Sequence, residues 1–516
     1  MKAGAGSDEF RAQNDTVIRA LTAFTRTAQW TPRVAILGAG PGGLNSAYKL
    51  QQAGIDTFTI YERQDGVGGV WRQNTYPGAA CDVKTHFYSF SWEMKKDWRK
   101  PYANQPEILE YLEHVADKYG LRSHLQLNTV ITSLEWNEGD ATWSITAGDG
   151  RVFEADLVIS ALGLFNEARF PDIPGRANFK GTTFHSWKWN HDHDLTGERV
   201  AVIGTGASAV QFVPEIASTI NRLHVFQRQP GWVFPKEDVP FTEEQIRRFE
   251  KVPFAARRQR WRIWWAMERG AQIYPGGKMH TTRMEATRDF VLKAVPDPKL
   301  QALVMPDYAM GCKRGLPSNE WYPTLQRDNV ELVADSIDHF TSNGIVTVDK
   351  VERNVDTVIF ATGFSTAKYL SSIDVVGRRG VHLRDEWSSG SRAFLGLTIT
   401  GFPNLFLLYG PNTNGTTSVI HVIEAQVRYI MKVIGRMRRG SFAAVDVKRA
   451  TLDRYDAKMQ AGLEGSVWAA GCSNYYADEH GKIRTQLPYR FYRYWLMTAR
   501  VRRRDYRWTP SKAARR

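Results

Sequence analysis

Two glycine-rich segments constrain the fold of this 516-residue chain more than any other feature. The first reads G-A-G-P-G-G at 38–43, and the second reads G-T-G-A-S-A at 204–209. Each follows an apolar strand pattern and opens a helix pattern, which makes a dinucleotide-binding turn a specific interpretation. Such a turn brings backbone close to a pyrophosphate, and the helix N-terminus stabilises its negative charge. The expected turn positions are Gly38, Gly40 and Gly43, then Gly204, Gly206 and Ala209.

Each glycine turn belongs to a strand–helix–strand unit, and the end of the second strand distinguishes the two units. The first unit ends in T-I-Y-E, which places Glu62 about 20 residues after the last glycine. A carboxylate there accepts hydrogen bonds from a ribose and repels a 2′-phosphate, as FAD binding requires. The second unit ends in V-F-Q-R, and Arg228 at the equivalent place suits the 2′-phosphate of NADPH. The sequence therefore predicts FAD at the first unit and NADPH at the second.

Apolar periodicity gives the elements that surround the two turns. Strands are expected at 33–37, 56–62, 199–203 and 222–227. Helices are expected at 43–53, 207–219 and 417–437, with an amphipathic helix at 7–27 before the first strand. Residues 240–304 are rich in Arg and Trp and helical in period, which predicts a helical insertion.

The expected fold class is α/β, with two Rossmann-like dinucleotide-binding domains and the helical insertion. Because strand patterns return after the insertion, both domains are expected to be discontinuous. These strands are expected at 330–333, 345–348, 356–360 and 404–410. The predicted divisions are an FAD domain of 1–165 and 385–516, an NADPH domain of 166–235 and 308–384, and an insertion of 236–307.

Charge concentrates at the C-terminus. Eight of the last seventeen residues are Arg or Lys and one is Asp, which accounts for half of the net charge of +14. We interpret 500–516 as a solvated tail rather than as a contact to nucleic acid or an anionic membrane. No membrane span is predicted, because the longest apolar run is broken by glycine and proline. No nucleic-acid partner is predicted, because the sequence holds no recognised nucleic-acid module.

The three cysteines, Cys81, Cys312 and Cys472, are far apart in sequence and form no C-x-x-C motif. This pattern predicts unpaired thiols in the reducing cytoplasm and argues against a disulfide-reducing enzyme. No metal site is predicted, because the H-x-H pair of His191 and His193 has no further ligand cluster near it in sequence.

The string F-K-G-T-T-F-H-S-W-K-W at 179–189 lies just before the second turn. It resembles the F-x-G-x-x-x-H-x-x-x-W signature of type I Baeyer–Villiger monooxygenases, and the resemblance extends from about residue 33 to about 495. Other segments match in the family's order: G-G-V-W-R at 68–72, Y-P-G-A-A-C-D-V at 76–83 and G-C-K-R at 311–314. The signature positions are Phe179, Gly181, His185 and Trp189, and the resemblance implies a linker that aligns the domains.

The resemblance also implies roles for residues elsewhere. Arg314 is expected to stabilise an anionic reaction centre, and Asp82 to position it. Lys313 is expected to join Arg228 at the 2′-phosphate of NADPH. Tyr475 stands where the family places a tryptophan over the nicotinamide. The further FAD contacts that the resemblance implies are Val70, Trp71, Asp82 and Val130.

The implied activity uses FAD, NADPH and dioxygen to insert one oxygen atom into a ketone. It gives an ester or lactone through a flavin peroxide and a tetrahedral adduct. The alternative is a flavin-containing monooxygenase that makes N- or S-oxides from soft nucleophiles. Those relatives usually end the signature with Phe, whereas this chain has Trp189. The ketone and the oligomeric state stay open.

Overall fold

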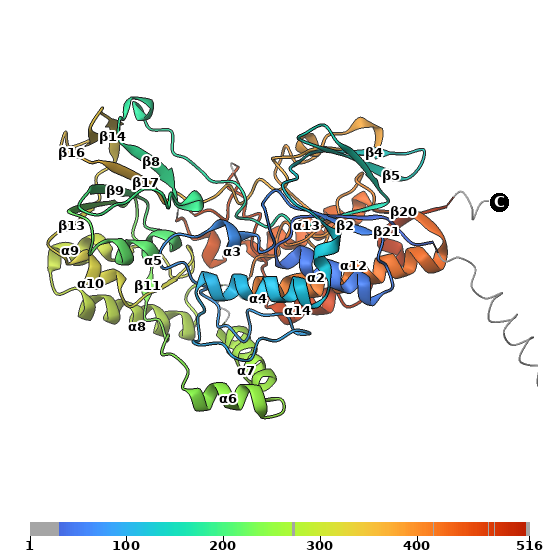
Figure 1. Ribbon diagram of the computed structural model, residues 1–516, viewed down its shortest axis with the longest axis horizontal. Coiled ribbons are helices and arrows are strands. Elements are labelled where there is room, and N and C mark those ends of the chain that lie inside the picture. Colours follow the sequence, from blue (N-terminus) through green and yellow to red (C-terminus); the bar gives the residue numbers. More distant parts are fainter. Residues whose placement is uncertain (1–29, 271–273, 416, 473, 479, 512–516) are drawn as a thin grey trace, which may run out of the picture.

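The computed structural model describes residues 30–270, 274–415, 417–472, 474–478 and 480–511. The helix expected at 7–27 therefore lies outside the described residues. Two parallel five-stranded sheets organise the chain, one in each half of the molecule (Figure 1). The first sheet has the order β19-β7-β1-β2-β3. Its strands are β1 (Val34–Leu37), β2 (Phe58–Tyr61), β3 (Leu125–Gln126), β7 (Leu157–Ser160) and β19 (Leu405–Leu407).

The second sheet repeats this design with the order β13-β10-β9-β17-β8. Parallel pairing places the carboxyl ends of β9 and β10 side by side, with Ile203 opposite Phe226. The fold class expected from the sequence is confirmed by this pair of Rossmann-type sheets. The strands are β8 (Thr182–His185), β9 (Arg199–Ile203), β10 (Arg222–Phe226), β13 (Val330–Val333) and β17 (Thr357–Phe360).

A helix follows each glycine turn, as the sequence predicts. Helix α2 (Pro41–Gln52) begins with a proline, whose missing N–H and fixed φ suit the first helical position. Helix α5 (Ala207–Ile216) ends before the predicted residue 219. Helix α12 (Val419–Gly440) packs on α2 and covers the first sheet through an apolar face. Ile36, Leu44 and Ile430 are fully buried in this core.

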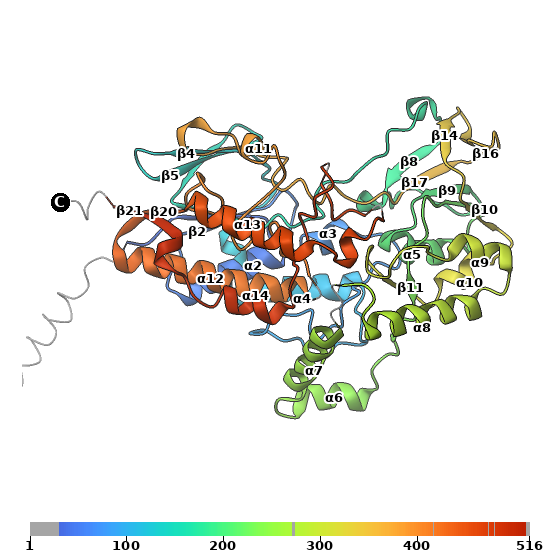
Figure 2. The same ribbon diagram turned by 180° about the vertical axis from the view of Figure 1, so that it is seen from behind.

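The expected helical insertion is present, with four helices among the described residues of 243–304 (Figures 1 and 2). Both views show α6 and α7 projecting from the body, whereas α8 lies along the second sheet's half. No helix among the described residues is long and apolar enough to span a bilayer. The four helices are α6 (Glu243–Lys251), α7 (Ala255–Gly270), α8 (Lys278–Ala294) and α9 (Pro298–Val304).

Smaller elements complete the two halves. A mixed sheet of order β18-β4-β5-β6, in which only the β18–β4 pair is parallel, stands beside the first sheet, and a three-stranded antiparallel sheet of order β14-β15-β16 stands beside the second. The strands are β4 (Ile131–Asn137), β5 (Thr142–Ala147), β6 (Val152–Ala155), β14 (Ile337–Phe340), β15 (Gly344–Thr347), β16 (Glu352–Asn354) and β18 (Asp374–Val376). The other α-helices are α3 (Val70–Gln73), α4 (Gln105–Lys118), α10 (Trp321–Leu325), α11 (Leu383–Glu386), α13 (Arg449–Leu463) and α14 (Phe491–Met497).

The prediction of a solvated tail at 500–516 is wrong for residues 500–511, the part of this segment that the structure describes. Strand β21 (Tyr506–Pro510) pairs antiparallel with β20 (Phe442–Val447). Tyr506 is 2% exposed, and its hydroxyl lies 2.9 Å from that of Tyr429 on α12. The arginines of this segment occupy exposed positions while the tyrosine is inserted into the core, so high charge density did not prevent strand formation.

Candidate active site

A cavity of about 1980 Å³ lies between the two sheets' glycine turns. Gly38 and Gly40 line it from the first turn, and Gly204 and Gly206 line it from the second. Both turns follow the carboxyl ends of parallel strands, which is where ligands bind in open α/β sheets. One cavity therefore has room and backbone donors for two dinucleotides.

The first turn is built for close approach of backbone groups. Gly38 has φ +101°, a conformation that favours glycine. A Cβ on Gly43 would lie 2.0 Å from the Gly38 carbonyl oxygen, so only glycine lets α2 pack on the turn. Gly40 is the N-cap of α2 and offers no side-chain cap. The first N–H groups of this helix are therefore directed to the cavity side, as a pyrophosphate requires.

Glu62 follows β2, where the FAD ribose is expected. Its Oε2 accepts a 2.7 Å hydrogen bond from the Ala39 N–H, and its Oε1 accepts one of 3.0 Å from the Gln64 N–H. The side chain is buried, yet it borders the cavity. These two bonds fix the carboxylate and leave acceptor capacity for ribose hydroxyls. The residues present therefore fit FAD.

The other expected FAD contacts also line the cavity. Val70 and Trp71 lie on α3, and the Trp71 indole N–H donates a 3.0 Å hydrogen bond to the Tyr88 hydroxyl. Val130 precedes β4 and is 52% exposed within this concave surface. An apolar residue left exposed in a concave wall is typical of a ligand pocket.

The second turn combines one crowded glycine, Gly204, with one that faces open space, Gly206. Gly204 has φ +111°, and its added Cβ would lie 2.5 Å from the Ala361 carbonyl oxygen. Gly206 is the N-cap of α5, and an added Cβ there would meet no heavy atom within 4 Å. Ala209 is fully buried one turn into α5 and does not line the cavity. The space above Gly206 fits the pyrophosphate of a second dinucleotide.

Two cations lie beside this second turn. Arg228 and Lys313 both line the cavity, and the Lys313 ammonium lies 5.1 Å from the ring centroid of Tyr308. Burial, together with repulsion from Arg228, lowers the pKa of Lys313 to about 8, against a weaker opposing effect of Asp307. A phosphate dianion between these cations relieves the repulsion, so the residues present fit the 2′-phosphate of NADPH.

Arg314 and Asp82 meet in the same cavity, although 232 residues separate them. The Arg314 Nε–H donates to Asp82 Oδ2 at 2.7 Å, and an Nη2–H donates to Oδ1 at 2.5 Å. The Asp82 carboxylate holds the pKa of the Arg314 guanidinium well above its ordinary value. Arg314 therefore stays positively charged at every working pH, with its orientation fixed by two parallel bonds.

Gln211 positions the segment that carries Asp82, and sequence reasoning missed it. From α5, its amide accepts a 3.0 Å hydrogen bond from the Tyr76 hydroxyl and donates one of 3.0 Å to the Ala80 carbonyl. A Cβ on Gly78, which has φ +73°, would lie 2.6 Å from the Gln211 carbonyl oxygen. A lone polar residue on an amphipathic helix carries no sequence signal for such a contact.

The four signature residues do not line the cavity. His185 ends β8, where burial lowers its pKa to about 4, so it is neutral at pH 7. Its Nδ1 accepts a 3.0 Å hydrogen bond from the Trp187 N–H. Trp189 packs against Phe212 of α5, and a Cβ on Gly181 would lie 2.2 Å from the Asp356 carbonyl oxygen. Phe179 packs on Phe340. These contacts favour a packing role in the second sheet over acid–base chemistry.

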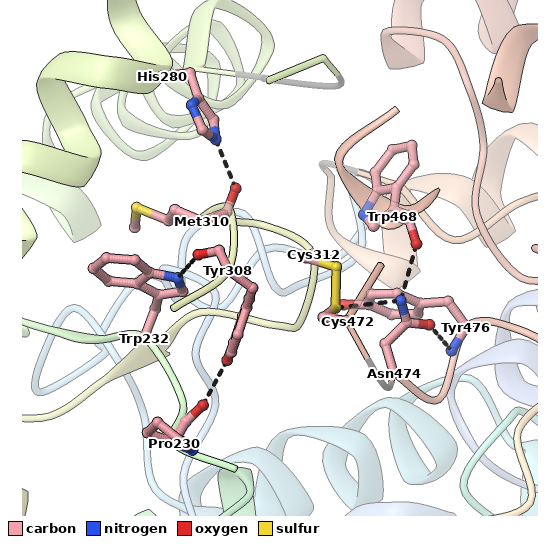
Figure 3. Close-up of a disulfide and its surroundings, with 10 residues drawn as sticks. All are labelled: Pro230, Trp232, His280, Tyr308, Met310, Cys312, Trp468, Cys472, Asn474 and Tyr476. Carbon is pink, nitrogen blue, oxygen red and sulfur yellow. Dashed lines mark hydrogen bonds between the residues drawn. A yellow bond between two sulfur atoms is a disulfide. The ribbon is translucent and has the colours of Figure 1, made fainter. Parts of the chain in front are cut away.

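The prediction of three unpaired thiols is wrong. Cys312 and Cys472 form a disulfide across 160 residues of sequence, and Cys81 alone is a buried free thiol (Figure 3). Sequence distance hid the pair, because the fold brings the G-C-K-R segment against a C-terminal loop. With this disulfide, the cysteines do not indicate a reducing compartment.

Comparison with known proteins identifies the family. The family model described as pyridine nucleotide-disulphide oxidoreductase matches residues 35–252. A Baeyer–Villiger monooxygenase of Pseudomonas aeruginosa is 41% identical over 449 residues, which cover 86% of this chain and 85% of that protein. The chain belongs to the Baeyer–Villiger monooxygenase family. A Baeyer–Villiger monooxygenase of Streptomyces coelicolor is 37% identical and covers 88% of both chains.

Solved structures confirm the fold of this Baeyer–Villiger family member. The structure of OTEMO in complex with FAD and NADP has a TM-score of 0.84 at 27% identity, covering 93% of this chain and all of that one. Cyclohexanone monooxygenase from Rhodococcus sp. Phi1 bound to NADP+ has a TM-score of 0.83 at 29% identity, covering 94% of this chain. The family resemblance read from 179–189 and the other motifs is therefore confirmed.

Proposed function

We propose that this protein is an FAD- and NADPH-dependent Baeyer–Villiger monooxygenase acting on apolar ketones. The overall reaction turns a ketone, O₂, NADPH and a proton into an ester or lactone, NADP+ and water. FAD, when bound, accepts electrons from NADPH and activates dioxygen for transfer to the ketone. The observation that carries the proposal is the Arg314–Asp82 pair, which lies in one cavity with both dinucleotide turns.

The chain's own residues divide into two cofactor-binding groups. Glu62 holds the FAD ribose, and the α2 N-terminus at Gly40 faces the pyrophosphate. Val70, Trp71 and Val130 form walls around that cofactor. Gly206 and the α5 N-terminus bind the NADPH pyrophosphate. We propose that the FAD-binding residues belong to one of the two discontinuous domains expected from the sequence, and the NADPH-binding residues to the other.

Arg314 supplies the charge that oxygen insertion needs. Negative charge develops on the oxygens of a tetrahedral adduct, and a fixed cation stabilises it without reorganising. Asp82 receives two of the five guanidinium N–H groups, so the other donors are available to the reacting oxygens. Tyr475 and Tyr476 border the same space, and we assign Tyr475 to the wall over the nicotinamide.

The test follows product and cofactor together. Purified protein is incubated with NADPH and a panel of cyclic and aryl ketones, and ester formed is compared with NADPH consumed. We expect near-stoichiometric ester for at least one ketone. Release of hydrogen peroxide alone across the whole panel contradicts the proposal. A thioether measured in parallel tests the alternative, because preference for the sulfoxide at low ketone turnover favours an N- or S-oxidising enzyme.

Gly206→Val tests the NADPH turn. Gly206 has an extended backbone with φ −81°, and an added Cβ would meet no heavy atom within 4 Å, so we expect the variant to fold. A bound pyrophosphate occupies that space, and we expect KM for NADPH to rise by about 10²-fold. The measurement is steady-state NADPH oxidation alongside FAD content. Unchanged KM with full FAD content places the pyrophosphate elsewhere.

The pKa of Lys313 predicts a pH dependence of NADPH use. With its pKa lowered to about 8, Lys313 is charged below that pH and loses its charge above it. The kcat/KM for NADPH should therefore fall by about tenfold between pH 7 and pH 9.5, as a charged phosphate contact is lost. NADH, which lacks the 2′-phosphate, provides the control and should show no such fall. Lys313→Arg, which stays charged, should flatten the NADPH profile.

A further inference from the structure

The disulfide joins two walls of the active-site cavity. Cys312 directly precedes Lys313 and Arg314, which line the cavity on one side. Cys472 lies just before Asn474 and Tyr475, which line it on the other. Figure 3 shows the sulfur–sulfur bond between these segments. The covalent link therefore lies within two residues of the guanidinium that serves the proposed reaction.

The Cys312 wall is anchored independently of the disulfide. The His280 Nε2–H donates a 2.8 Å hydrogen bond to the Met310 carbonyl, and the Trp232 indole N–H donates one of 3.0 Å to the Tyr308 carbonyl. The Tyr308 hydroxyl donates in turn to the Pro230 carbonyl at 2.7 Å. These partners belong to α8 and to the strand region of the second half (Figure 3). This wall is therefore expected to keep its place when the disulfide opens.

The Cys472 wall is held by bonds within its own turn and by bonds from Thr366 and Arg484. Asn474 Nδ2 donates a 2.9 Å hydrogen bond to the Trp468 carbonyl, and its Oδ1 accepts one of 3.0 Å from the Tyr476 N–H. The Tyr475 carbonyl accepts a 2.6 Å hydrogen bond from the Thr366 hydroxyl. Across the gap, Gly311 approaches Val467 closely, since an added Cβ would lie 3.3 Å from its Cγ2. The disulfide is the covalent connection between these two sets of contacts.

We propose that Cys312 and Cys472 form a redox-controlled clasp that holds the Tyr475 wall against the Arg314 wall. Closed, it keeps water from the reaction centre and couples NADPH oxidation to ester formation. Open, as two thiols, it lets the walls separate, so that more of the oxygen leaves as hydrogen peroxide. The proposal rests on the proposed monooxygenase function and adds a control of its efficiency that depends on thiol state.

The oxidant that forms the disulfide is the hydrogen peroxide that the enzyme itself releases. The partly exposed Cys472 thiolate attacks hydrogen peroxide, the O–O bond breaks, and Cys472 becomes a sulfenic acid as water leaves. The buried Cys312 thiolate then attacks that sulfur, the S–O bond breaks, and a second water leaves. The two sulfurs lose two electrons in total, and one peroxide becomes two waters. A dithiol reductant reverses the change by thiol–disulfide exchange.

The first measurement counts thiols without any catalytic assay. The air-equilibrated holoenzyme is denatured and alkylated, and mass spectrometry reads the labels. We expect one label, on Cys81, before reduction by a phosphine and labels on all three cysteines after it. Reduced enzyme given NADPH and air without ketone should regain the disulfide, and catalase should prevent this. Three labels before reduction overturn the proposal, and reoxidation that ignores catalase overturns the self-supplied oxidant.

The second measurement compares leakage in the two states. With a ketone present that the enzyme converts, peroxide released per NADPH consumed should rise by about fivefold when wild type is reduced, because releasing a cross-link favours open conformations. The C312S/C472S variant should leak like reduced wild type and should not respond to the phosphine, which makes it the matched control. Reduced wild type needs no substitution, so a variant that folds poorly leaves the test intact. Equal leakage in both wild-type states overturns the clasp.

Failure of the monooxygenase proposal gives a different result. If no ketone yields an ester, the proposed function fails, yet the thiol count still reports whether the disulfide forms and re-forms. If esters form while leakage ignores thiol state, the clasp alone fails.

Discussion

Replacing Arg314 by alanine should lower ester formation by about 10²- to 10³-fold, while reduction of FAD by NADPH continues. The guanidinium is the cation that Asp82 holds in the cavity by two hydrogen bonds, so its loss removes preorganised stabilisation of the developing negative charge. Binding of NADPH depends on other residues and should change little. Stopped-flow reduction under nitrogen and ester yield in air separate the two half-reactions.

The matched control is another arginine that pairs with an aspartate through two bonds. Arg122 donates to both oxygens of Asp117, with an Nη2–Oδ2 distance of 2.9 Å, on the exposed surface beyond α4. Arg122→Ala removes an equivalent ion pair, which is worth little when exposed, and should leave ester formation unchanged. An Arg314→Ala enzyme that oxygenates ketones at the wild-type rate removes the catalytic assignment of Arg314.

Replacing Gly43 by alanine should give a protein that purifies without its yellow cofactor. The new methyl group would lie 2.0 Å from the Gly38 carbonyl oxygen, a backbone atom that cannot rotate away. Helix α2 must then move off the turn, and we expect FAD affinity to fall by about 10²-fold. The measurement is FAD content after purification, followed by titration with added FAD.

Gly435→Ala supplies the control for a glycine that also lies inside a helix. On α12, the added Cβ would meet only the end of the Arg439 side chain, at 3.4 Å. Alanine is the better helix former, so this variant should be at least as stable as wild type and fully loaded with FAD. Equal FAD loss in both variants would mean that the crowding at Gly43 is not the cause.

The parts of the fold that depend on local patterns could be predicted from sequence. Each glycine turn lies between a β-branched strand and a helix, and Glu62 or Arg228 follows the second strand within the same unit. All of that information is contained in a short stretch of chain. Strand β21 was missed because the arginines around Tyr506 resemble a charged tail, whereas its partner β20 lies about 60 residues earlier.

In the active site, too, the contacts between distant segments could not be predicted from local sequence patterns. Arg314 and Asp82 could be paired only through the family resemblance, because 232 residues separate them and a charged residue is usually solvated. The Cys312–Cys472 bond and the Gln211 contacts had no comparable motif. Contacts between distant segments depend on how two domains dock, which neither periodicity nor composition records.

The hydrogen bonds between Gln211 and Ala80 restrict how segments of this chain can be exchanged with those of its relatives. Helix α5 packs in the core of the second sheet, but the loop it holds carries Asp82, and the adjacent Cys81 lies in the core of the first sheet. A chimera that exchanges only residues 166–384 therefore combines Gln211 and its helix from one parent with the 76–83 segment of the other parent. Exchanging residues 76–83 as well keeps the two contacting segments from the same parent. In this protein the natural unit of exchange is the helix together with the loop it holds, and a crossover point should be chosen accordingly.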